Sequence, residues 1–424
     1  MHVSSGDPRL PFDHQSSFPK KSAYVAGAVV LVVGFGAGFV VGGAWRPISV
    51  ADSSDVEPAG VNMAPVWKAW QVIDEKFVPA AVATSTHVAS TSAEVNQDRV
   101  WGMIQGLAES LNDPYTFFLP PTENKMFEQD MSGAFEGVGM EIAVRDEVLT
   151  VVSPIKGNPA EKAGIKSGDK ILKINGELTK GMDISTAVEK IRGPKGSAVV
   201  LTVLRDGWTE AHDISVMRDV IDVPAVTTTA RADGVFVITL SSFTSNSPDL
   251  FRDALRSFVE SHDTKLVLDL RGNPGGYLEA AVDMASWFLP SGSVIVTEDY
   301  DGHGDNIIHR SRGYDIFNKN LRMVVLLDHG SASASEILAD ALHYWGVAKL
   351  VGVNSFGKGS VQELVDIADG SALKVTVARW LGPDGIQIPI QGIAPDVKID
   401  LTDTDAAAGK DPQLDKAIEL LKAQ

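Results

Sequence analysis

The second half of the chain, after Asp219, alternates short apolar strands with segments of helical periodicity, and this alternation restricts the possible folds more than any other feature. The strands are KLVLDL (265–270), MVVLLD (323–328) and AKLVGV (348–353). Apolar strands that are separated by helices favour partly parallel pairing. We therefore expect an α/β core over residues 219–424, including a C-terminal extension.

The preceding residues have two other patterns. Residues 61–132 carry apolar side chains at helical spacing, interrupted at 79–98 by a run of small residues that predicts a loop. Residues 133–218 contain short strands broken by glycines, with one helical segment at 184–191. We expect a small helical region followed by a compact β-rich module.

The N-terminus contains 23 consecutive residues without a charge, at positions 23–45. At ~1.5 Å per residue this run spans roughly 34 Å, enough for a hydrocarbon core of about 30 Å. Lys20 and Lys21 place a head of residues 1–22 in the cytoplasm. We expect a single-pass anchor in the cell (inner) membrane, a linker at 46–60 and an extracytoplasmic, periplasmic body. A cleaved signal peptide is the alternative.

Gly34, Gly38 and Gly42 lie four residues apart on one face of this expected helix. Such G-x-x-x-G steps let two membrane helices pack closely, so a homo-oligomer is one interpretation. Small residues are also common in membrane helices, which leaves the interpretation open.

Composition excludes several functions. The formal net charge is −18, and no basic stripe with interleaved aromatic residues is present, so we expect no nucleic-acid binding. The chain has no cysteine, which excludes thiol catalysis, disulfides and thiolate metal sites. No metal-ligand cluster is visible, and we expect neither a metal nor a cofactor.

Residues 328–338, DHGSASASEIL, lie where an apolar strand stops and a helical segment begins. Ser333 followed by Glu336 fits the S-x-x-E capping box, which predicts a helix N-cap. A nucleophilic serine also favours a helix N-terminus, where free amides and the helix dipole stabilise developing negative charge. The pattern is compatible with a cap, a nucleophile, or both.

A nucleophilic serine needs a base, and histidine and lysine are the candidates. His329 is only four residues from Ser333 across a turn, and His343 lies roughly 15 Å along the helix. Lys358 stands in a glycine-flanked loop, 25 residues after Ser333, which suits a helix running out and a strand running back. Burial must lower its pKa from about 10.4 toward ~8, at a cost of roughly 3 kcal/mol at neutral pH.

The strand at 265–270 ends in the glycine-rich turn RGNPGG, and a helix is expected to start near Tyr277. Such turns expose backbone amides that can bind an anion, including the oxyanion of an acyl-transfer reaction. A phosphate loop is a rival interpretation, but its lysine and serine are missing. A purely structural turn is the other alternative.

Within the β-rich module, GVGMEI (137–142) and SPIKGNPAEKAGIKSGDKILKINGELTKGM (153–182) resemble a PDZ domain. PDZ domains bind a peptide as an edge strand and hold its terminal carboxylate in backbone amides. The resemblance implies that Val138, Gly139 and Met140 form the carboxylate loop. The alternative is that these glycines only allow a strand to start here and bind no peptide.

Six motifs occur in the order and spacing of the C-terminal processing (tail-specific) proteases, the S41-type serine proteases. The motifs are SLNDPYTFFLPP, FEGVGMEI, the PDZ-like stretch, LDLRGNPGG, GSASASEI and SFGKGSVQ. The resemblance covers about residues 66–400. It implies a PDZ domain at 133–218 and an S41-type core of ClpP/crotonase-like α/β fold at 219–424.

The resemblance also implies roles for individual residues. Ser333 would be the nucleophile, Lys358 the base, and Gln362 the group that orients the lysine amine. The amides of Gly276 and Ala334 would form the oxyanion hole. These roles describe an acyl-enzyme mechanism without a metal.

Two positions need separate comment. Some family members couple peptide binding to activation through an arginine in a stretch like IRGPKG, and here that residue is Arg192. The commoner role of an arginine at a helix end is exposure to solvent. Asn112 stands where many members carry aspartate, a departure that we interpret as neutral.

We therefore expect an α/β multidomain, membrane-anchored serine endopeptidase that cleaves extracytoplasmic proteins with free apolar C-termini. One alternative is a non-catalytic PDZ scaffold, against which the intact Ser333, Lys358 and Gln362 argue. Another is a trypsin-like quality-control protease with a PDZ domain. That class needs an upstream histidine and aspartate, a G-N-S-G-G loop and a PDZ domain after the catalytic domain, which this sequence lacks.

Overall fold

The computed structural model divides the chain into two units by contact, residues 1–88 and residues 89–424, each of which is treated by itself. The structure describes residues 60–78, 92–145, 148–182, 184–222, 224–317, 321–402, 404–405 and 408–423. No helix in these ranges is long and apolar enough to cross a membrane. The predicted anchor at 23–45 lies outside them, so it stays a prediction.

The described part of the first unit is the helix α2 (Ala64–Lys76), where the sequence predicts one. A proline occupies its first turn, a position that needs no backbone N–H, and the Asn62 side chain accepts a hydrogen bond from the Ala64 amide at 3.0 Å. The helix ends where Phe77 adopts an extended conformation.

The second unit begins with α3 (Ser92–Glu109), β1 (Phe117–Leu119) and α4 (Pro121–Ser132). The predicted loop at 79–98 is wrong for residues 92–98, which belong to α3. Alanine, glutamate and glutamine in this stretch have good helix propensity, and this outweighs the missing apolar periodicity. Residues 79–91 lie outside the described part of the chain.

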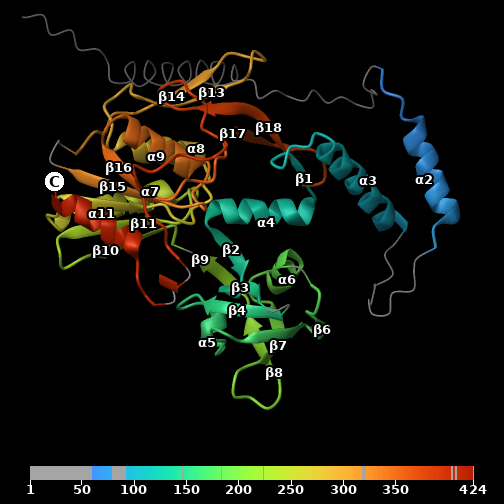
Figure 1. Cartoon of the computed structure of the whole chain (residues 1–424). Coiled ribbons are helices and arrows are strands. Elements are labelled where there is room, and N and C mark those ends of the chain that lie inside the picture. The colour runs from blue at the N-terminus through green and yellow to red at the C-terminus, as the bar shows by residue number, and fades with distance from the viewer. Residues whose placement is uncertain are drawn as a thin grey trace, which may run out of the picture. The chain divides into compact units, whose positions relative to one another are not determined.

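The β-rich module that resembles a PDZ domain, called the PDZ module below, is an antiparallel sheet in the order β3-β4-β5-β7-β8, with β6 paired to β5 (Figure 1). Its elements are β3 (Met140–Arg145), β4 (Val148–Pro154), α5 (Pro159–Lys162), β5 (Lys170–Ile174), β6 (Glu177–Leu178), α6 (Ile184–Ile191), β7 (Ala198–Leu204) and β8 (His212–Met217). Asp169 of the G-D-x-I motif is fully buried and accepts hydrogen bonds from the Lys166 amide at 2.8 Å and from Arg205 at 2.6 Å. The motif aspartate therefore holds the turn before β5.

A two-stranded ribbon lies where the chain enters and leaves this module. β2 (Ala134–Gly137) pairs antiparallel with β9 (Asp219–Asp222), so the two connections run side by side. The module limits at 133 and 218 stay predictions.

The C-terminal core contains a six-stranded sheet in the order β10-β11-β12-β15-β16-β19. The strands are β10 (Val226–Ala230), β11 (Val235–Leu240), β12 (Lys265–Asp269), β15 (Arg322–Leu327), β16 (Ala348–Gly352) and β19 (Val397–Lys398). All pairs are parallel except β10 with β11. The predicted α/β core with partly parallel pairing is therefore confirmed.

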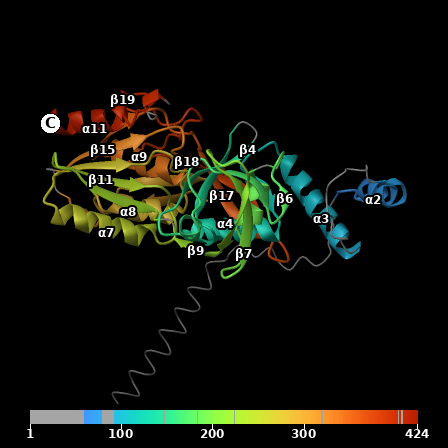
Figure 2. The ribbon, with the colours of Figure 1, turned by 90° about the horizontal axis from the view of Figure 1, so that it is seen from below.

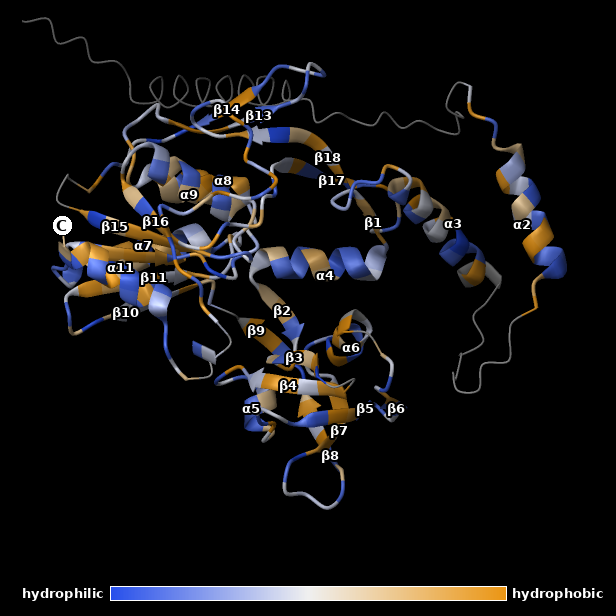
Figure 3. Ribbon diagram, viewed as in Figure 1, coloured by the Kyte–Doolittle hydropathy of each residue, from blue (hydrophilic) through white to orange (hydrophobic). Residues whose placement is uncertain are grey.

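Helices cover both faces of this sheet. One face packs on α7 (Ser247–Glu260), α8 (Leu278–Ser286) and α9 (Ala334–Tyr344), and the other on α11 (Pro412–Ala423) (Figure 2). Along β15, Met323, Val325 and Leu327 face the three helices, whereas Val324 and Leu326 face α11. Burial on both faces explains why these strands are continuous apolar runs, visible as hydrophobic colour along β11 and β15 in Figure 3.

A second sheet of five strands lies in the same unit. It pairs β1, β18 (Ala372–Leu381), β13 (Val294–Asp299) and β14 (Ile307–Arg310) in that order, and β17 (Ser360–Asp366) also pairs with β18. This sheet places the residues around β1, which precede the PDZ module in sequence, next to strands that follow the Lys358 loop.

Arg271, the arginine of the RGNPGG turn, ties this turn to the start of α11. Its guanidinium lies 2.7 Å from the Asp269 carboxylate and 2.8 Å from the Asp411 carboxylate, and it donates to Gln413 Oε1 at 3.0 Å. Only 15% of the arginine side chain is exposed. This cluster fixes the start of the C-terminal helix α11 at the edge of the sheet where β12 ends and the glycine-rich turn begins.

We predict that Arg271→Ala lowers the free energy of unfolding by about 3–5 kcal/mol, because it leaves two partly buried carboxylates without their counterion. The measurement is urea unfolding followed by circular dichroism. Arg256→Ala is the matched control, since it removes an exposed pair with Asp253 on α7 and is expected to cost less than about 0.5 kcal/mol. Equal effects of the two substitutions would contradict the prediction.

Candidate active site

The motifs singled out in the sequence gather at one edge of the six-stranded sheet. β11, β12, β15 and β16 are parallel, so their carboxyl ends lie together. The glycine-rich turn follows β12, the serine segment follows β15, and the Lys358 loop follows β16. Ligand and catalytic sites of open α/β sheets lie at this edge.

Ser333 is the N-cap of α9 and has an unusual backbone conformation. Its φ is 55° and its ψ is −115°, a region that residues other than glycine rarely occupy. Its amide donates a hydrogen bond of 2.9 Å to Glu336 Oε2, the carboxylate of the predicted capping box. The surrounding hydrogen bonds hold Ser333 in this strained conformation. Its side chain is half-buried and lies at the N-terminus of α9.

The structure distinguishes the three serines of the segment. Ser331 donates to the Leu270 carbonyl and Ser335 to the Asn273 carbonyl, each at 2.9 Å, and both side chains are fully buried. These two hydroxyls fasten the glycine-rich turn to the start of α9. Ser333 differs from them: its side chain is only half-buried and accepts a hydrogen bond from the backbone of Glu336 in the capping box.

The glycine-rich turn lies directly against Ser333. A Cβ atom at Gly275, where φ is +100°, would come within 2.8 Å of Ser333 Cβ and 3.0 Å of the Ala334 amide nitrogen. The amides of Gly276 and Ala334, the predicted oxyanion donors, make no hydrogen bond within the described part of the chain. Only glycine permits this close approach of the two turns. Among the described residues, the amides of Gly276 and Ala334 are unpaired hydrogen-bond donors near Ser333, as an oxyanion hole requires.

Lys358 is largely buried in the loop after β16. Burial, together with the charge of Lys374, lowers the pKa of Lys358 to about 8, although Glu336 and Asp113 act to raise it. Its Nζ lies 5.4 Å from the centre of the Tyr115 ring. An amine with this pKa is partly neutral near neutral pH and can accept a proton. Among the described residues no hydrogen bond joins Lys358 Nζ to Ser333 Oγ.

Glu336 links the serine to the lysine. Its carboxylate is completely buried, and besides the Ser333 amide it accepts hydrogen bonds from the Lys358 amide at 3.0 Å and the Gly357 amide at 2.7 Å. A fourth donor is the Ser355 hydroxyl at 2.6 Å. One carboxylate thus sets the turn that carries Ser333 and the loop that carries Lys358 relative to each other.

Gln362 has other partners than the predicted one. Its amide nitrogen donates to Ser360 Oγ at 2.8 Å and to Thr376 Oγ1 at 3.3 Å, and within the described chain it makes no hydrogen bond to Lys358. Thr376 donates in turn to Asp113 Oδ2 at 2.6 Å. The orientation of the lysine amine by Gln362 therefore stays a prediction.

Asp113, which precedes a proline in the SLNDPY motif, belongs to this polar network. Burial alone would raise the pKa of Asp113, but hydrogen bonds from Thr376, Thr116 and the Tyr115 amide lower it. The ionised carboxylate fixes the segment that carries Tyr115 against β18. The network connects Gln362 to the aromatic residue above the lysine.

Histidine chemistry has no support here. His343 lies 3.5 Å from Asp396, and in the described residues no histidine makes a hydrogen bond to Ser333. The expectation that neither His329 nor His343 serves the serine agrees with this geometry.

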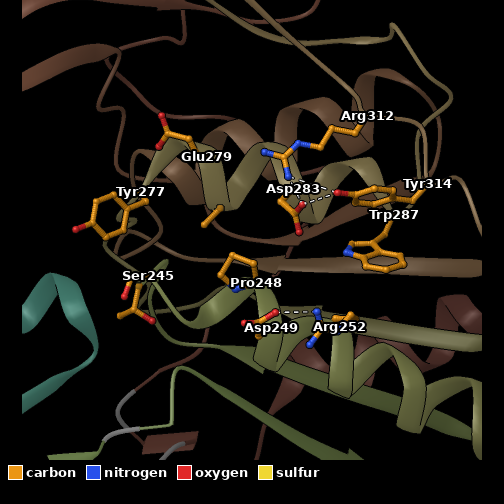
Figure 4. Close-up of a pocket in the computed structure, with 12 residues that line it drawn as sticks. Ser245, Pro248, Asp249, Arg252, Tyr277, Glu279, Asp283, Trp287, Arg312 and Tyr314 are labelled. Atoms are coloured by element: carbon orange, nitrogen blue, oxygen red, sulfur yellow. Dashed lines mark hydrogen bonds and ion pairs between the residues drawn. The ribbon is translucent and has the colours of Figure 1, made fainter. Parts of the chain in front are cut away.

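A pocket of about 390 Å³ opens beside the glycine-rich turn (Figure 4). Tyr277, which follows Gly276 and is 41% exposed, forms one end, and Trp287 and Tyr314 form the other. Its two arginines are already paired with carboxylates, Arg252 with Asp249 and Arg312 with Asp283. Neither Ser333 nor Lys358 lines this pocket, and its paired arginines offer no additional catalytic group.

The predicted carboxylate loop lies between β2 and β3. The carbonyls of Val138 and Gly139 accept hydrogen bonds from Ala160 and Ile155, at 2.8 and 2.9 Å. The amides of Val138 and Gly139 make none within the described residues. Gly139 has φ +71°, and a Cβ there would clash with Asn158 at 2.5 Å, so the loop requires glycine. Met140 begins β3.

Arg192 lies where the PDZ module meets α4. Its guanidinium forms an ion pair of 2.8 Å with Asp130 of α4 and stacks over Phe135 of β2, 4.3 Å from the ring centre. Only 18% of the side chain is exposed. The solvent-exposed alternative is therefore wrong, and the arginine bridges the PDZ helix α6 to the segment that leads into the module.

Three residues near the site were not identified from the sequence as parts of it: Glu336 beyond its capping role, Asp113, and Lys374 on β18. Glu336 was visible only as the third residue of a capping box. Asp113 lies in the SLNDPYTFFLPP motif but received no role, and Lys374 gave no local signal. The pairing of β1 with β18 brings both residues toward Lys358.

The comparisons with known proteins agree with this geometry. Residues 234–399 match the model of the family described as peptidase family S41, and residues 150–205 match the model of a PDZ domain. The chain therefore belongs to the S41 peptidases that carry a PDZ domain.

Relatives of known name are similar over most of the chain. The carboxy-terminal processing protease CtpA of Bacillus subtilis is 39% identical over 302 residues, which cover 71% of this chain and 64% of the relative. CtpB of the same organism is 38% identical over 303 residues, which cover 70% and 62%. The chain thus spans slightly less than two thirds of the length of these relatives.

One solved structure supports the fold. A crystal structure from Bacteroides fragilis, provisionally assigned to the S41 proteases, superposes with a TM-score of 0.51 at 16% identity and covers 87% of this chain and 99% of the other. The likeness concerns the fold alone.

We predict that Glu336→Gln slows the reaction of Ser333 with a fluorophosphonate about 10²-fold, because the amide group faces two hydrogen-bond donors and displaces the lysine loop. Intact-mass spectrometry measures the rate. Glu363→Gln on β17 removes the same charge from an exposed position and is expected to leave the rate unchanged. If Glu336→Gln is labelled at the wild-type rate, the Glu336 carboxylate does not position Ser333 and Lys358.

Proposed function

We propose that the protein is a membrane-anchored serine endopeptidase that captures the C-terminal tails of extracytoplasmic proteins with its PDZ domain and cleaves them with Ser333 and Lys358. The named relatives CtpA and CtpB are carboxy-terminal processing proteases, which supports this class of activity.

The observation that carries the proposal is the contact of Glu336 with both halves of the pair. A non-catalytic scaffold has no need for a strained serine at a helix N-terminus or for a lysine whose burial lowers its pKa to about 8. Both features carry an energetic cost, and both suit acyl transfer.

In the first step, Ser333 Oγ attacks the scissile carbonyl carbon while its proton passes to neutral Lys358. The amides of Gly276 and Ala334 stabilise the oxyanion. When the tetrahedral intermediate collapses, the C–N bond breaks and Lys358 returns the proton to the leaving amine. Water, deprotonated by the same lysine, then hydrolyses the acyl-enzyme.

Tail recognition uses the loop of Val138, Gly139 and Met140. Its amides bind the terminal carboxylate, and the tail adds as a strand beside β3. Arg192 transmits this binding to α4 through Asp130, because the ion pair joins the PDZ module to the segment before it. The apolar run at 23–45 anchors the protein, with the body outside the cytoplasm.

The testing experiment is proteolysis of an unfolded reporter with an apolar C-terminal tail, using the full chain in detergent. Wild type is expected to cleave, whereas Ser333→Ala and Lys358→Arg are expected to lose more than about 10³-fold in rate, since guanidinium is no base near neutral pH. Amidation of the tail is expected to raise KM more than it lowers kcat.

A matched control is Ser335→Ala, which removes a neighbouring hydroxyl that hydrogen bonds the Asn273 carbonyl. It is expected to reduce stability more than activity. Tight tail binding by a wild-type protein that is as inert as Ser333→Ala would favour the scaffold.

The pH dependence follows from the lowered pKa of Lys358. The lysine must be neutral to accept a proton, and the neutral fraction rises with pH through its pKa of about 8. We predict that kcat/KM has an acidic limb near pH 8, below which it falls about tenfold per pH unit. A limb below pH 6 would indicate a histidine or carboxylate base instead.

A further inference from the structure

Lys374 on β18 is a second lysine beside the candidate active site. Its Nζ lies 5.1 Å from the centre of the Phe117 ring and 5.2 Å from that of Phe127. The Lys374 side chain is half-buried, and no carboxylate of the described residues lies within ion-pair distance of it. Aromatic faces stabilise an ammonium group without neutralising its charge.

The two lysines lie over neighbouring aromatic residues of one segment. Lys358 Nζ lies over Tyr115, and Lys374 Nζ lies over Phe117, two positions later and paired with Lys374 across the β1–β18 ladder. Both ammonium groups therefore lie against the same short segment, in a partly buried site. Two like charges that share such a site repel each other.

The surrounding charges are few. Lys358 is faced by Glu336 from α9, by Asp113 and the Tyr115 phenol from the segment before β1, and by Lys374 from β18. The Glu336 carboxylate is engaged by four donors, and Asp113 by two threonine hydroxyls and an amide. Among these neighbours of Lys358, Lys374 is the residue that can carry a positive charge.

We infer that Lys374 is a positioning residue that acts through its charge, opposing protonation of Lys358 and so keeping the base in the form that accepts the Ser333 proton. The inference rests on the proposed function. The positions of the two ammonium groups over Tyr115 and Phe117 support this assignment. It agrees with the causes that lower the pKa of Lys358, which are burial first and the charge of Lys374 second. Burial also lowers the pKa of Lys374 itself, which reduces but does not reverse the effect of its charge.

A purely structural role is the alternative, because the aliphatic stem of Lys374 also packs on the two phenyl rings. Lys374→Met keeps this packing and removes the charge, and Lys374→Gln is a second neutral variant in case the first folds poorly. Lys374→Arg keeps the charge. Lys173→Met, on an exposed position of β5, removes one charge from the PDZ module as a matched control.

The experiment measures the rate at which a fluorophosphonate labels Ser333 from pH 6 to 10 in the full chain. The neutral variants are expected to move the acidic limb upward by roughly 0.5–1.5 pH units, with labelling at pH 7 slowed about 3–30-fold and the rate at pH 10 preserved. Lys374→Arg and Lys173→Met are expected to keep the wild-type limb.

The outcomes separate the two claims. An unmoved limb in a folded neutral variant would overturn the role of Lys374, as would an equal shift in Lys374→Arg. If wild type is labelled no faster than Ser333→Ala at every pH, the proposed function fails, and the inference fails with it.

Discussion

The buried carboxylate of Glu336 is the interaction on which the arrangement of the site depends. It receives four hydrogen bonds, from the amides of Ser333, Gly357 and Lys358 and from the Ser355 hydroxyl. A buried carboxyl group is stable only when its oxygens receive hydrogen bonds, and here the donors come from two loops. The loops must therefore remain in one mutual geometry, which places a strained serine next to a lysine.

Parallel strand pairing brings these loops to the same place. The turns after β12, β15 and β16 share an edge because every crossover returns the chain to the same end of the sheet. The hydroxyls of Ser331 and Ser335 then join the turn after β12 to that after β15. Residue 275 must be glycine because a Cβ atom there would come within 2.8 Å of Ser333 Cβ.

Electrostatics at the site depends on a second sheet that is distant in sequence. β1 and β18 place Tyr115, Phe117 and Lys374 around Lys358, and Asp113 is fixed by Thr116 and Thr376. Burial and like charge lower the pKa of the base while two carboxylates limit the effect. Arg192 joins the PDZ module to α4, the helix that lies between β1 and the module in sequence.

The sequence by itself determined the α/β core, the β-rich module and the position of each motif, because apolar periodicity, glycine-rich turns and capping signals are local. It also predicted a helix N-cap at Ser333 and a loop at Lys358, whose roles rest on the family resemblance. It misjudged residues 92–98 as a loop, since helix propensity there outweighs periodicity. The contact of Gln362 with Thr376, the three donors of Glu336 beyond the capping box, and the neighbourhood of Lys374 were decided only by the tertiary structure. These contacts join separate strands and loops, and strand register, which no local pattern encodes, sets which side chains meet.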